Sequence, residues 1–373
     1  MRYPSHWGHP IERKFPVNKI TKRALSGLAL AGAASLVLAG CAAAPDTGET
    51  AVEQLDYLAC AVSDEGSWND KSFNQSVYEG LTKSRDELGV QIQDAESNTP
   101  DDFAPNLQAM IDASCDLTIA VGFNLVDAVN AAAEANPEVN FVTIDGWSNV
   151  ATNLKPVGYS MNQSSYLAGY LAAAQSTTKI VGTYGGMQID AVVDFMTGYY
   201  YGAMAWGADN DTTVKVVGWD PMKKEGDFIG DFTPNSGTSK AIAAAQLQAG
   251  ADVLFPVGGD QFGASSEAIT ESGVDARIIG VDKDIANTSP EYADWILTSA
   301  EKRMTSAVYD IIKGIAVDGL AFSGDYYIGT LENGGTALSA ITNYSGSQPQ
   351  SEIEAKLEEL KAGIISGDIN PLG

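Results

Sequence analysis

Short apolar runs alternate with longer amphipathic stretches along the chain from residue 55 onward. In the first half, this pattern predicts strands at 55–62, 90–95, 117–121 and 141–144, and helices at 72–88, 103–113 and 125–135. The apolar runs are continuous, which is typical of parallel strands that are buried on both faces. Strands that alternate with helices therefore predict an α/β fold with a helix-covered parallel sheet.

The same pattern starts again after residue 160. It predicts helices at 166–174, 191–206, 239–248 and 262–271, and strands at 180–183, 214–219, 253–257 and 278–281. A further helix at 304–320 is expected to return to the first lobe. Ser351 and Glu354 have the spacing of a capping box for a last helix, which has apolar residues at Ile353 and Leu357 and ends at Gly367.

Two similar α/β lobes without a Pro/Ser-rich linker predict a hinged clamshell joined by several short crossovers. We expect the first lobe to comprise 55–160 plus about 288–322, and the second to comprise 161–287 plus about 323–373.

The first forty residues predict an export signal. Six basic residues precede the small, apolar stretch Ala24–Gly40, which is shorter than the roughly 20 apolar residues of a membrane span. Leu38-Ala39-Gly40-Cys41 resembles a bacterial lipobox, which implies cleavage before Cys41 and its lipidation. The alternative is a plain signal peptide with a chance cysteine. Residues 41–54 are expected to be a flexible tether, so the protein would be lipid-anchored on the extracytoplasmic face of the cell membrane.

Charge and histidine content narrow the classes of function. The net charge is −26, from 22 basic and 48 acidic residues, which disfavours nucleic-acid binding. Both histidines, His6 and His9, lie in the predicted signal peptide, so the remaining chain has none for a Ser-His-Asp triad or a His-ligated zinc site. We expect no cofactor and no metal.

Cys60 and Cys115 lie in or beside predicted strands, and either a disulfide or a buried thiol pair fits them.

Candidate ligand contacts are expected where parallel strands end, because ligands of open α/β sheets bind at the carboxyl edge. Acids, amides and aromatic residues recur after the predicted strands, namely Asp64, Phe73, Asn74, Asn124, Asp145, Asp282 and Asp284, and Gly258 follows another of these strands. This mixture suits a neutral, hydroxylated and partly aromatic ligand. No GxxxxGK[ST] motif is present to hold a phosphate. Each of these residues alone could equally cap a helix, close a turn or fill a core.

Several motifs together resemble the basic membrane protein (BMP, PnrA-like) family of substrate-binding lipoproteins. They are Asp64-(x)5-Asp70-Lys-Ser-Phe73-Asn-Gln, Pro137–Asp145, Ser165–Ala173, Gly250-Ala-Asp-Val253, Gly258-Gly259, Ile279–Asp284 and Leu297–Lys302. The resemblance implies a type I periplasmic-binding-protein fold with two Rossmann-like lobes and a multi-crossover hinge. It also implies an ABC importer that takes up purine nucleosides, with a permease as partner. We expect the receptor to be a monomer.

The resemblance also implies roles for single residues. Phe73 and Phe232 would sandwich the base, and Asp64 would hydrogen-bond it. Asp145, Gly258, Lys302 and one acid of the Asp282/Asp284 pair would hold the ribose and line the pocket. Trp68-Asn69 and Lys283 depart from the family pattern, as does the segment 228–237.

We therefore expect a receptor that is not an enzyme. A receptor for a sugar or another small solute in the same fold is the first alternative. A carboxylate-based nucleoside hydrolase and a lipoprotein sensor or adhesion module are the others.

Overall fold

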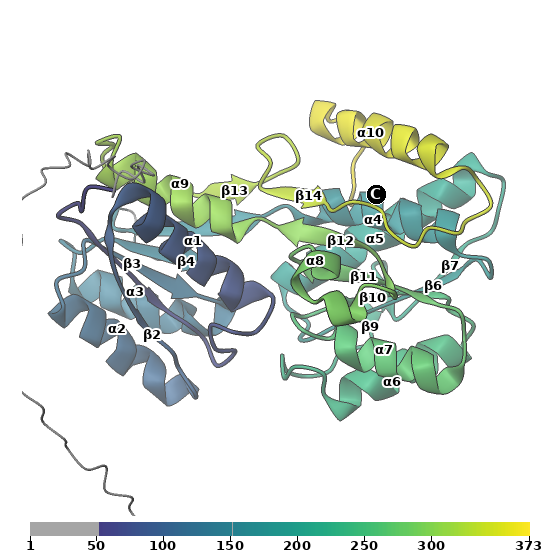
Figure 1. Cartoon of the computed structure of the whole chain (residues 1–373), viewed down its shortest axis with the longest axis horizontal. Coiled ribbons are helices and arrows are strands. Elements are labelled where there is room, and N and C mark those ends of the chain that lie inside the picture. Colours follow the sequence, from purple (N-terminus) through teal and green to yellow (C-terminus); the bar gives the residue numbers. More distant parts are fainter. Residues whose placement is uncertain (1–51, 151) are drawn as a thin grey trace, which may run out of the picture. The chain divides into compact units, whose positions relative to one another are not determined.

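The computed structural model describes residues 52–150 and 152–373, and these form two α/β lobes (Figure 1). The predicted signal peptide, Cys41 and residues 42–51 of the tether lie outside the described residues. Within the described ranges, no helix combines the length and the apolar character that crossing a membrane requires.

The first lobe is built on a six-stranded parallel sheet. Its strands follow the order β13-β5-β4-β3-β1-β2, with bounds Leu58–Val62 (β1), Gln91–Ala95 (β2), Leu117–Val121 (β3), Phe141–Ile144 (β4), Leu154–Tyr159 (β5) and Tyr327–Gly329 (β13). One face is covered by α1 (Phe73–Leu88) and α9 (Met304–Ala316), and the other by α2 (Phe103–Asp112) and α3 (Val126–Ala135). The 3₁₀ turns η1 (Pro100–Asp102) and η2 (Phe123–Leu125) precede α2 and α3.

The second lobe repeats this arrangement with one antiparallel edge. Its sheet has the order β14-β12-β11-β10-β6-β7, with bounds Ile180–Gly185 (β6), Lys215–Val217 (β7), Val253–Val257 (β10), Arg277–Asp282 (β11), Ile296–Lys302 (β12) and Thr336–Leu338 (β14). Only β14 pairs antiparallel among these described strands. A short hairpin follows β7, comprising β8 (Trp219–Asp220) and β9 (Glu225–Gly226).

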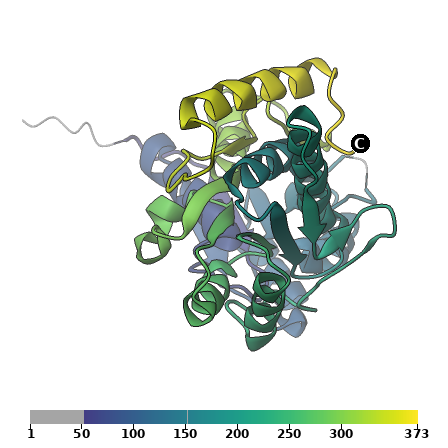
Figure 2. The same ribbon diagram turned by 90° about the vertical axis from the view of Figure 1, so that its right-hand side faces the viewer.

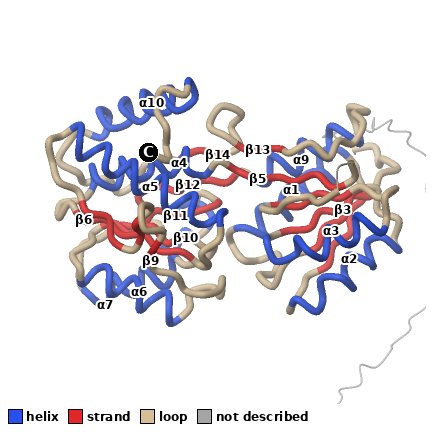
Figure 3. The backbone as a smooth tube through the Cα atoms, turned by 180° about the vertical axis from the view of Figure 1, so that it is seen from behind, coloured by secondary structure: helices blue, strands red, loops and turns tan. Residues whose placement is uncertain are grey.

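Helices cover both faces of the second sheet, as they do for the first (Figure 3). One layer comprises α4 (Met161–Gln175), α5 (Asp190–Asp209) and α10 (Gln350–Ser366), and Figure 2 shows α10 at the outside of this layer. The other comprises α6 (Gly237–Gln248) and α7 (Phe262–Ser272), with α8 (Ile285–Thr288) and η3 (Pro290–Tyr292) following β11. Both lobes thus have the helix–sheet–helix layers that the continuous apolar strands predict.

The chain crosses between the sheets three times: between β5 and α4, between β12 and α9, and between β13 and β14. This differs from the expected lobe boundaries. We expected 288–322 in the first lobe and 323–373 in the second, but β12 belongs to the second sheet and β13 to the first. The short run 296–300 carries Thr298 and Ser299 and gave no clear strand signal. The expected return of residues 304–320 to the first lobe holds for α9, which packs on α1.

Three glycines, Gly169, Gly198 and Gly202, allow α4 and α5 to pack with their backbones in contact. A Cβ on Gly169 would lie 2.0 Å from the carbonyl oxygen of Tyr199, and one on Gly202 would lie 1.9 Å from that of Tyr166. No side chain fits at such separations, so glycine is required at this helix contact. Nearly every residue of α4 is buried as a result, which explains its unbroken run of small and apolar residues.

Most predicted elements are confirmed, with some exceptions. The strands β13 and β14 and the short helix α8 were not predicted, and the predicted strand at 214–219 is divided into β7 and β8. β5, which contains Pro156 and Gly158, and β12 were not predicted. The capping box is wrong, because Pro349 precedes the first turn of α10 and Ser351 lies inside the helix. The predicted apolar face and C-terminus of this helix are confirmed, since Gly367 ends it in the left-handed conformation.

Cys60 and Cys115 form a disulfide, with their Cα atoms 6.0 Å apart. Cys60 lies within β1 and Cys115 lies just before the neighbouring strand β3. Of the two alternatives that the sequence left open, the structure therefore has the disulfide.

Candidate functional site

A cavity of about 500 Å³ lies between the carboxyl ends of the strands of the two lobes. It is lined by nine of the ten candidate residues, namely Asp64, Phe73, Asn74, Asn124, Asp145, Phe232, Gly258, Asp282 and Lys302. Asp284 is not among the lining residues. The strand-end argument therefore located the cavity, while the role of each residue toward a ligand stays a prediction.

Hydrogen bonds to Asp70 hold the loop between β1 and α1 at its α1 end. Asp70 accepts hydrogen bonds from the backbone N–H groups of Ser72 (2.9 Å), Asn74 (2.8 Å) and Gln75 (3.0 Å). These groups are left unpaired at a helix N-terminus, so Asp70 stabilises the start of α1. Phe73, the first residue of α1, is thereby presented to the cavity.

Trp68 anchors the middle of the same loop to the end of β2. Its Nε1–H donates to Asp94 over 2.8 Å, and its backbone N–H donates to Glu96 over 2.7 Å. Its ring also stacks on Tyr78 of α1, with the ring centroids 5.2 Å apart. The departure from the family pattern at Trp68 thus has a structural role in holding the loop.

Asp64 is oriented toward the cavity by two donors. Its Oδ1 accepts hydrogen bonds from Asn74 Nδ2 (2.7 Å) and from the backbone N–H of Gly66 (2.9 Å). A Cβ on Gly122 would lie 2.6 Å from Asp64 Oδ2, so the glycine at position 122 leaves space for the carboxylate. Desolvation by burial, opposed by these hydrogen bonds and reinforced by Asp70 and Glu65, raises the pKa of Asp64 to about 6.

Lys302 and Asp145 form a buried ion pair at the base of the cavity. The two residues lie 157 positions apart in the sequence and come from the ends of β12 and β4. The ammonium also lies near three aromatic rings, 5.4 Å from the centroid of Phe73, 5.7 Å from Tyr159 and 5.2 Å from Phe195. The one positive charge among the lining residues is therefore already neutralised.

The structure distinguishes Asp282 from Asp284, which the sequence could not. Asp282 ends β11 with a positive φ of 66°, is 7% exposed, and accepts a hydrogen bond from Ser72 Oγ of the other lobe over 2.7 Å. Burial raises the pKa of Asp282, and the charge of Lys302 and the bond from Ser72 oppose this rise. Asp284 instead precedes α8, where its carboxylate accepts from Asn287 Nδ2 over 2.6 Å. Asp282 therefore lines the cavity and Asp284 does not, while the role of either acid toward a ligand stays a prediction.

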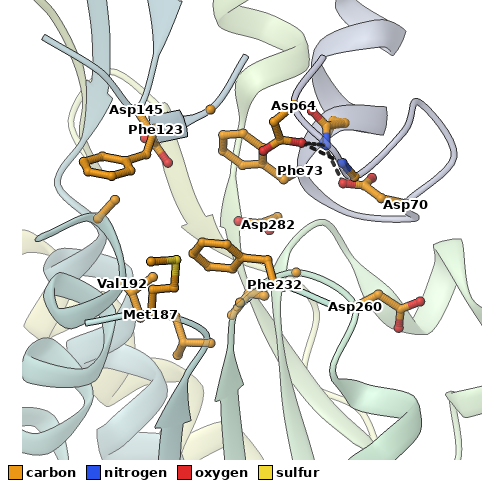
Figure 4. A pocket seen from close by; sticks show the side chains of 18 of the residues that line it. Asp64, Asp70, Phe73, Phe123, Asp145, Met187, Val192, Phe232, Asp260 and Asp282 are labelled. Atoms are coloured by element: carbon orange, nitrogen blue, oxygen red, sulfur yellow. Dashed lines mark hydrogen bonds between the residues drawn. The ribbon is translucent and has the colours of Figure 1, made fainter. Parts of the chain in front are cut away.

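Aromatic rings from both lobes project into the cavity. Figure 4 shows Phe73 reaching in from the first lobe and Phe232 from the second. Gly186 makes room for Phe232, because a Cβ at this position would lie 2.5 Å from its Cδ1. A flat group that enters between the two lobes could contact both rings.

Part of the cavity lining is apolar. The second lobe supplies an apolar wall of Met187, Val192 and Phe195. We had not predicted Val192 and Phe195, which lie on α5, because strand ends alone were considered. The N-terminal turns of a helix that follows a strand face the same edge of the sheet, and this signal could have found them.

The charged lining residues are predominantly acidic. They comprise seven acids and one base, namely Asp64, Glu65, Asp70, Asp145, Asp231, Asp260, Asp282 and Lys302. This charge repels phosphate groups and provides acceptors for hydroxyl and amino groups. Within residues 52–150 and 152–373, no group of His, Cys, Asp and Glu has the arrangement of a metal site.

Two α/β lobes that enclose an acidic, acceptor-rich cavity, with an aromatic ring entering from each lobe, define a small-molecule receptor. The chain belongs to the Bmp family, because the family model described as "ABC transporter substrate-binding protein PnrA-like" matches residues 58–368. This is a family of substrate-binding proteins rather than enzymes. The resemblance stated from the sequence motifs is confirmed.

Individual relatives and solved structures agree with this assignment. The chain is 31% identical to the ABC transporter nucleoside-binding protein BmpA of Lactococcus lactis subsp. cremoris over 364 residues, covering 93% of this chain and 98% of that protein. It is 27% identical to basic membrane protein D of Borreliella burgdorferi, covering 84% and 92%. The crystal structure of an ABC transporter solute-binding protein from Aeropyrum pernix matches with a TM-score of 0.73 at 24% identity, covering 84% of this chain and 92% of that one. The predicted type I periplasmic-binding-protein fold is thereby confirmed.

Proposed function

We propose that this protein is the lipid-anchored receptor of an ABC importer and that it binds purine nucleosides in the cavity between its lobes. The observation that carries the proposal is the pair of rings, Phe73 and Phe232, which enter one acidic cavity from opposite lobes. The relative that is named a nucleoside-binding protein, at 31% identity, supports the same ligand class.

A purine base suits the space between the two rings because it is planar and loses little conformational freedom on stacking. Each base–aromatic stack contributes about 1–3 kcal/mol, as measured by alanine substitution. The ribose hydroxyls would donate to the buried carboxylates of Asp145 and Asp282, and Lys302 offers them a donor. A nucleotide would bring its phosphate against an acidic wall, so we expect nucleosides to bind and nucleotides to be rejected.

Binding would couple to closure of the lobes. A ligand that contacts both rings interacts with both lobes only when these lie together, so it shifts the equilibrium toward the closed form. A permease that accepts the closed form would then distinguish loaded from empty receptors. We propose that the receptor acts as a monomer on the extracytoplasmic face, anchored by lipid on Cys41 with residues 42–54 as tether.

The experiment is titration calorimetry of the full chain with adenosine, guanosine, inosine, ribose and AMP. We expect binding of at least one nucleoside and none of ribose or AMP. Alanine at Phe73 or Phe232 should weaken nucleoside binding by about 1–3 kcal/mol each. Binding of sugars without nucleosides would overturn the nucleoside assignment, and release of free base from inosine would overturn the receptor assignment.

A matched pair of variants tests the role of the cavity carboxylates. Asp282→Asn changes a buried acid that lines the cavity, whereas Asp284→Asn changes an acid two residues away that does not line it. We expect the first variant to lower nucleoside affinity by about tenfold or more, the size of a lost charge-assisted hydrogen bond. The second should bind as the wild type does. Equal affinities for both variants would contradict the placement of the ribose at Asp282.

A further inference from the structure

We propose that two ion pairs outside the cavity, Lys71–Glu291 and Lys283–Glu79, hold the lobes together and thereby set ligand affinity. We call these two pairs the inter-lobe latch. The proposal rests on the proposed function, because a latch matters for a receptor that closes on its ligand. The four residues of the latch would be positioning residues, because they would affect ligand affinity without touching the ligand.

The latch joins two segments that lie side by side only because the lobes meet. In the first lobe, Lys71 precedes α1 and Glu79 lies on α1. In the second, Lys283 follows β11 and Glu291 lies in η3. Lys71 Nζ lies 2.7 Å from Glu291 Oε1, and Lys283 Nζ donates to Glu79 Oε1. Each lobe therefore supplies one cation and one anion, so the pairs are reciprocal.

Reciprocal pairs favour one alignment of the lobes. A slide that brought Lys71 toward Lys283, or Glu79 toward Glu291, would place like charges together and cost energy. Glu79 is further oriented by Gln75 Nε2, which donates to its Oε1 over 2.9 Å. The latch thus specifies an alignment in addition to attracting the two surfaces.

A direct contact connects the latch to the cavity. Ser72 and Asp282, which share a hydrogen bond of 2.7 Å across the lobes, are the immediate chain neighbours of Lys71 and Lys283. Asp282 also lines the cavity. Closure that forms the latch therefore places Asp282 at the same time, and opening that breaks the latch withdraws it.

The two pairs differ in their exposure. The side chain of Lys283 is 9% exposed and that of Glu79 is 41%, whereas Lys71 and Glu291 are 41% and 49% exposed. Removing Glu79 leaves the buried ammonium of Lys283 without this partner, which is strongly unfavourable in the closed form. In the open form the same ammonium is hydrated, so the substitution acts on closure. Salt screens the exposed pair Lys71–Glu291 far more effectively.

The test uses the full chain with inosine as the probe, in about 50 mM and about 500 mM NaCl, between which the screening length falls severalfold. Glu79→Gln should raise the Kd for inosine by about tenfold through faster dissociation. The charge swap Glu79→Lys with Lys283→Glu should return the Kd to within about threefold of the wild type, because the pair is re-formed in reverse. Raising the salt should weaken the wild type more than the variant Glu291→Gln.

The control is Glu271→Gln, which removes an ion pair within the second lobe, Lys240–Glu271, whose length of 2.7 Å equals that of Lys71–Glu291. It should leave the Kd unchanged. The proposal is overturned if Glu79→Gln binds inosine as tightly as the wild type, or if Glu271→Gln weakens binding equally.

A second measurement separates the latch from the ligand assignment. If the wild type binds no nucleoside, the proposed function fails, and small-angle scattering of the unliganded chain still tests the latch. The double variant Glu79→Gln/Glu291→Gln should then have a larger radius of gyration than the control Glu271→Gln. Equal radii would overturn the latch without reference to any ligand.

Discussion

The pKa of Asp64 makes a quantitative prediction about stability and pH. Burial raises this pKa from 3.8 to about 6 in the folded protein. Asp64→Asn removes the titration but keeps a side-chain oxygen that can accept from Asn74 Nδ2 and the backbone N–H of Gly66. The variant therefore isolates the cost of the buried charge.

The sign follows from proton binding in the two states. Between pH 4 and pH 6 the folded state holds a proton on Asp64 that the unfolded state has released, so stability falls as the pH rises. One pKa unit corresponds to 1.36 kcal/mol, so the rise to about 6 corresponds to about 2–3 kcal/mol. The free energy of unfolding of the wild type, minus that of Asp64→Asn, should therefore fall by this amount between about pH 4 and pH 6.5. Below and above this range the difference between the two proteins should be constant.

The assay is urea unfolding of the full chain and the variant, with the disulfide intact, at half-unit steps from pH 3.5 to 7.5. Asp86→Asn serves as the control, because hydrogen bonding to Arg85 lowers the pKa of Asp86 and its contribution is lost as the pH falls. The difference curve between the wild type and Asp86→Asn should slope in the opposite direction at the acidic end of the range, near and below pH 4, and stay flat above it. Parallel curves for the wild type and Asp64→Asn across this range would refute the argument that burial dominates the environment of Asp64.

Two further predictions concern stability. Gly202→Ala should destabilise the protein by about 2–3 kcal/mol or more, because its Cβ would overlap a backbone oxygen of α4; Gly237→Ala, where nothing lies within 4 Å, should have little effect on the melting temperature. Replacing Cys60 and Cys115 together by Ala should lower the free energy of unfolding by about 4 kcal/mol, which is the chain-entropy value for a disulfide that joins residues 55 positions apart. An unchanged free energy of unfolding in urea for the double variant would contradict this.

The sequence located the candidate site better than it defined the members of that site. The rule that ligands bind at the carboxyl ends of parallel strands brought Asp64, Asn124, Asp145 and Asp282 to one cavity. The same rule could not exclude Asp284, because two acids after one strand look alike until the backbone direction at the strand end is known. The positive φ at Asp282 leaves that residue facing the cavity, and the chain then turns away into α8.

The predicted elements failed where local signals were weak or conflicting. β5 contains Pro156 and Gly158, which usually mark turns, yet it pairs with β4 and β13 inside the sheet. β12 contains polar residues that bond to the following segment, as Thr298 does to the backbone oxygen of Ser339 over 3.0 Å. Both strands are stabilised by neighbours far away in the sequence, which a local pattern does not contain.

The pattern of apolar residues by itself determined that the chain forms two helix-covered parallel sheets, and that a cavity would lie where their strands end. The motifs determined the family, and the composition excluded histidine chemistry from residues 41–373, which contain no histidine. Only the tertiary structure decided that Lys302 pairs with Asp145, that Phe73 and Phe232 share one cavity, and that Lys283 meets Glu79. Apolar periodicity reports the burial of single elements, whereas these contacts join residues of different lobes and depend on strand order and on where the chain crosses the hinge.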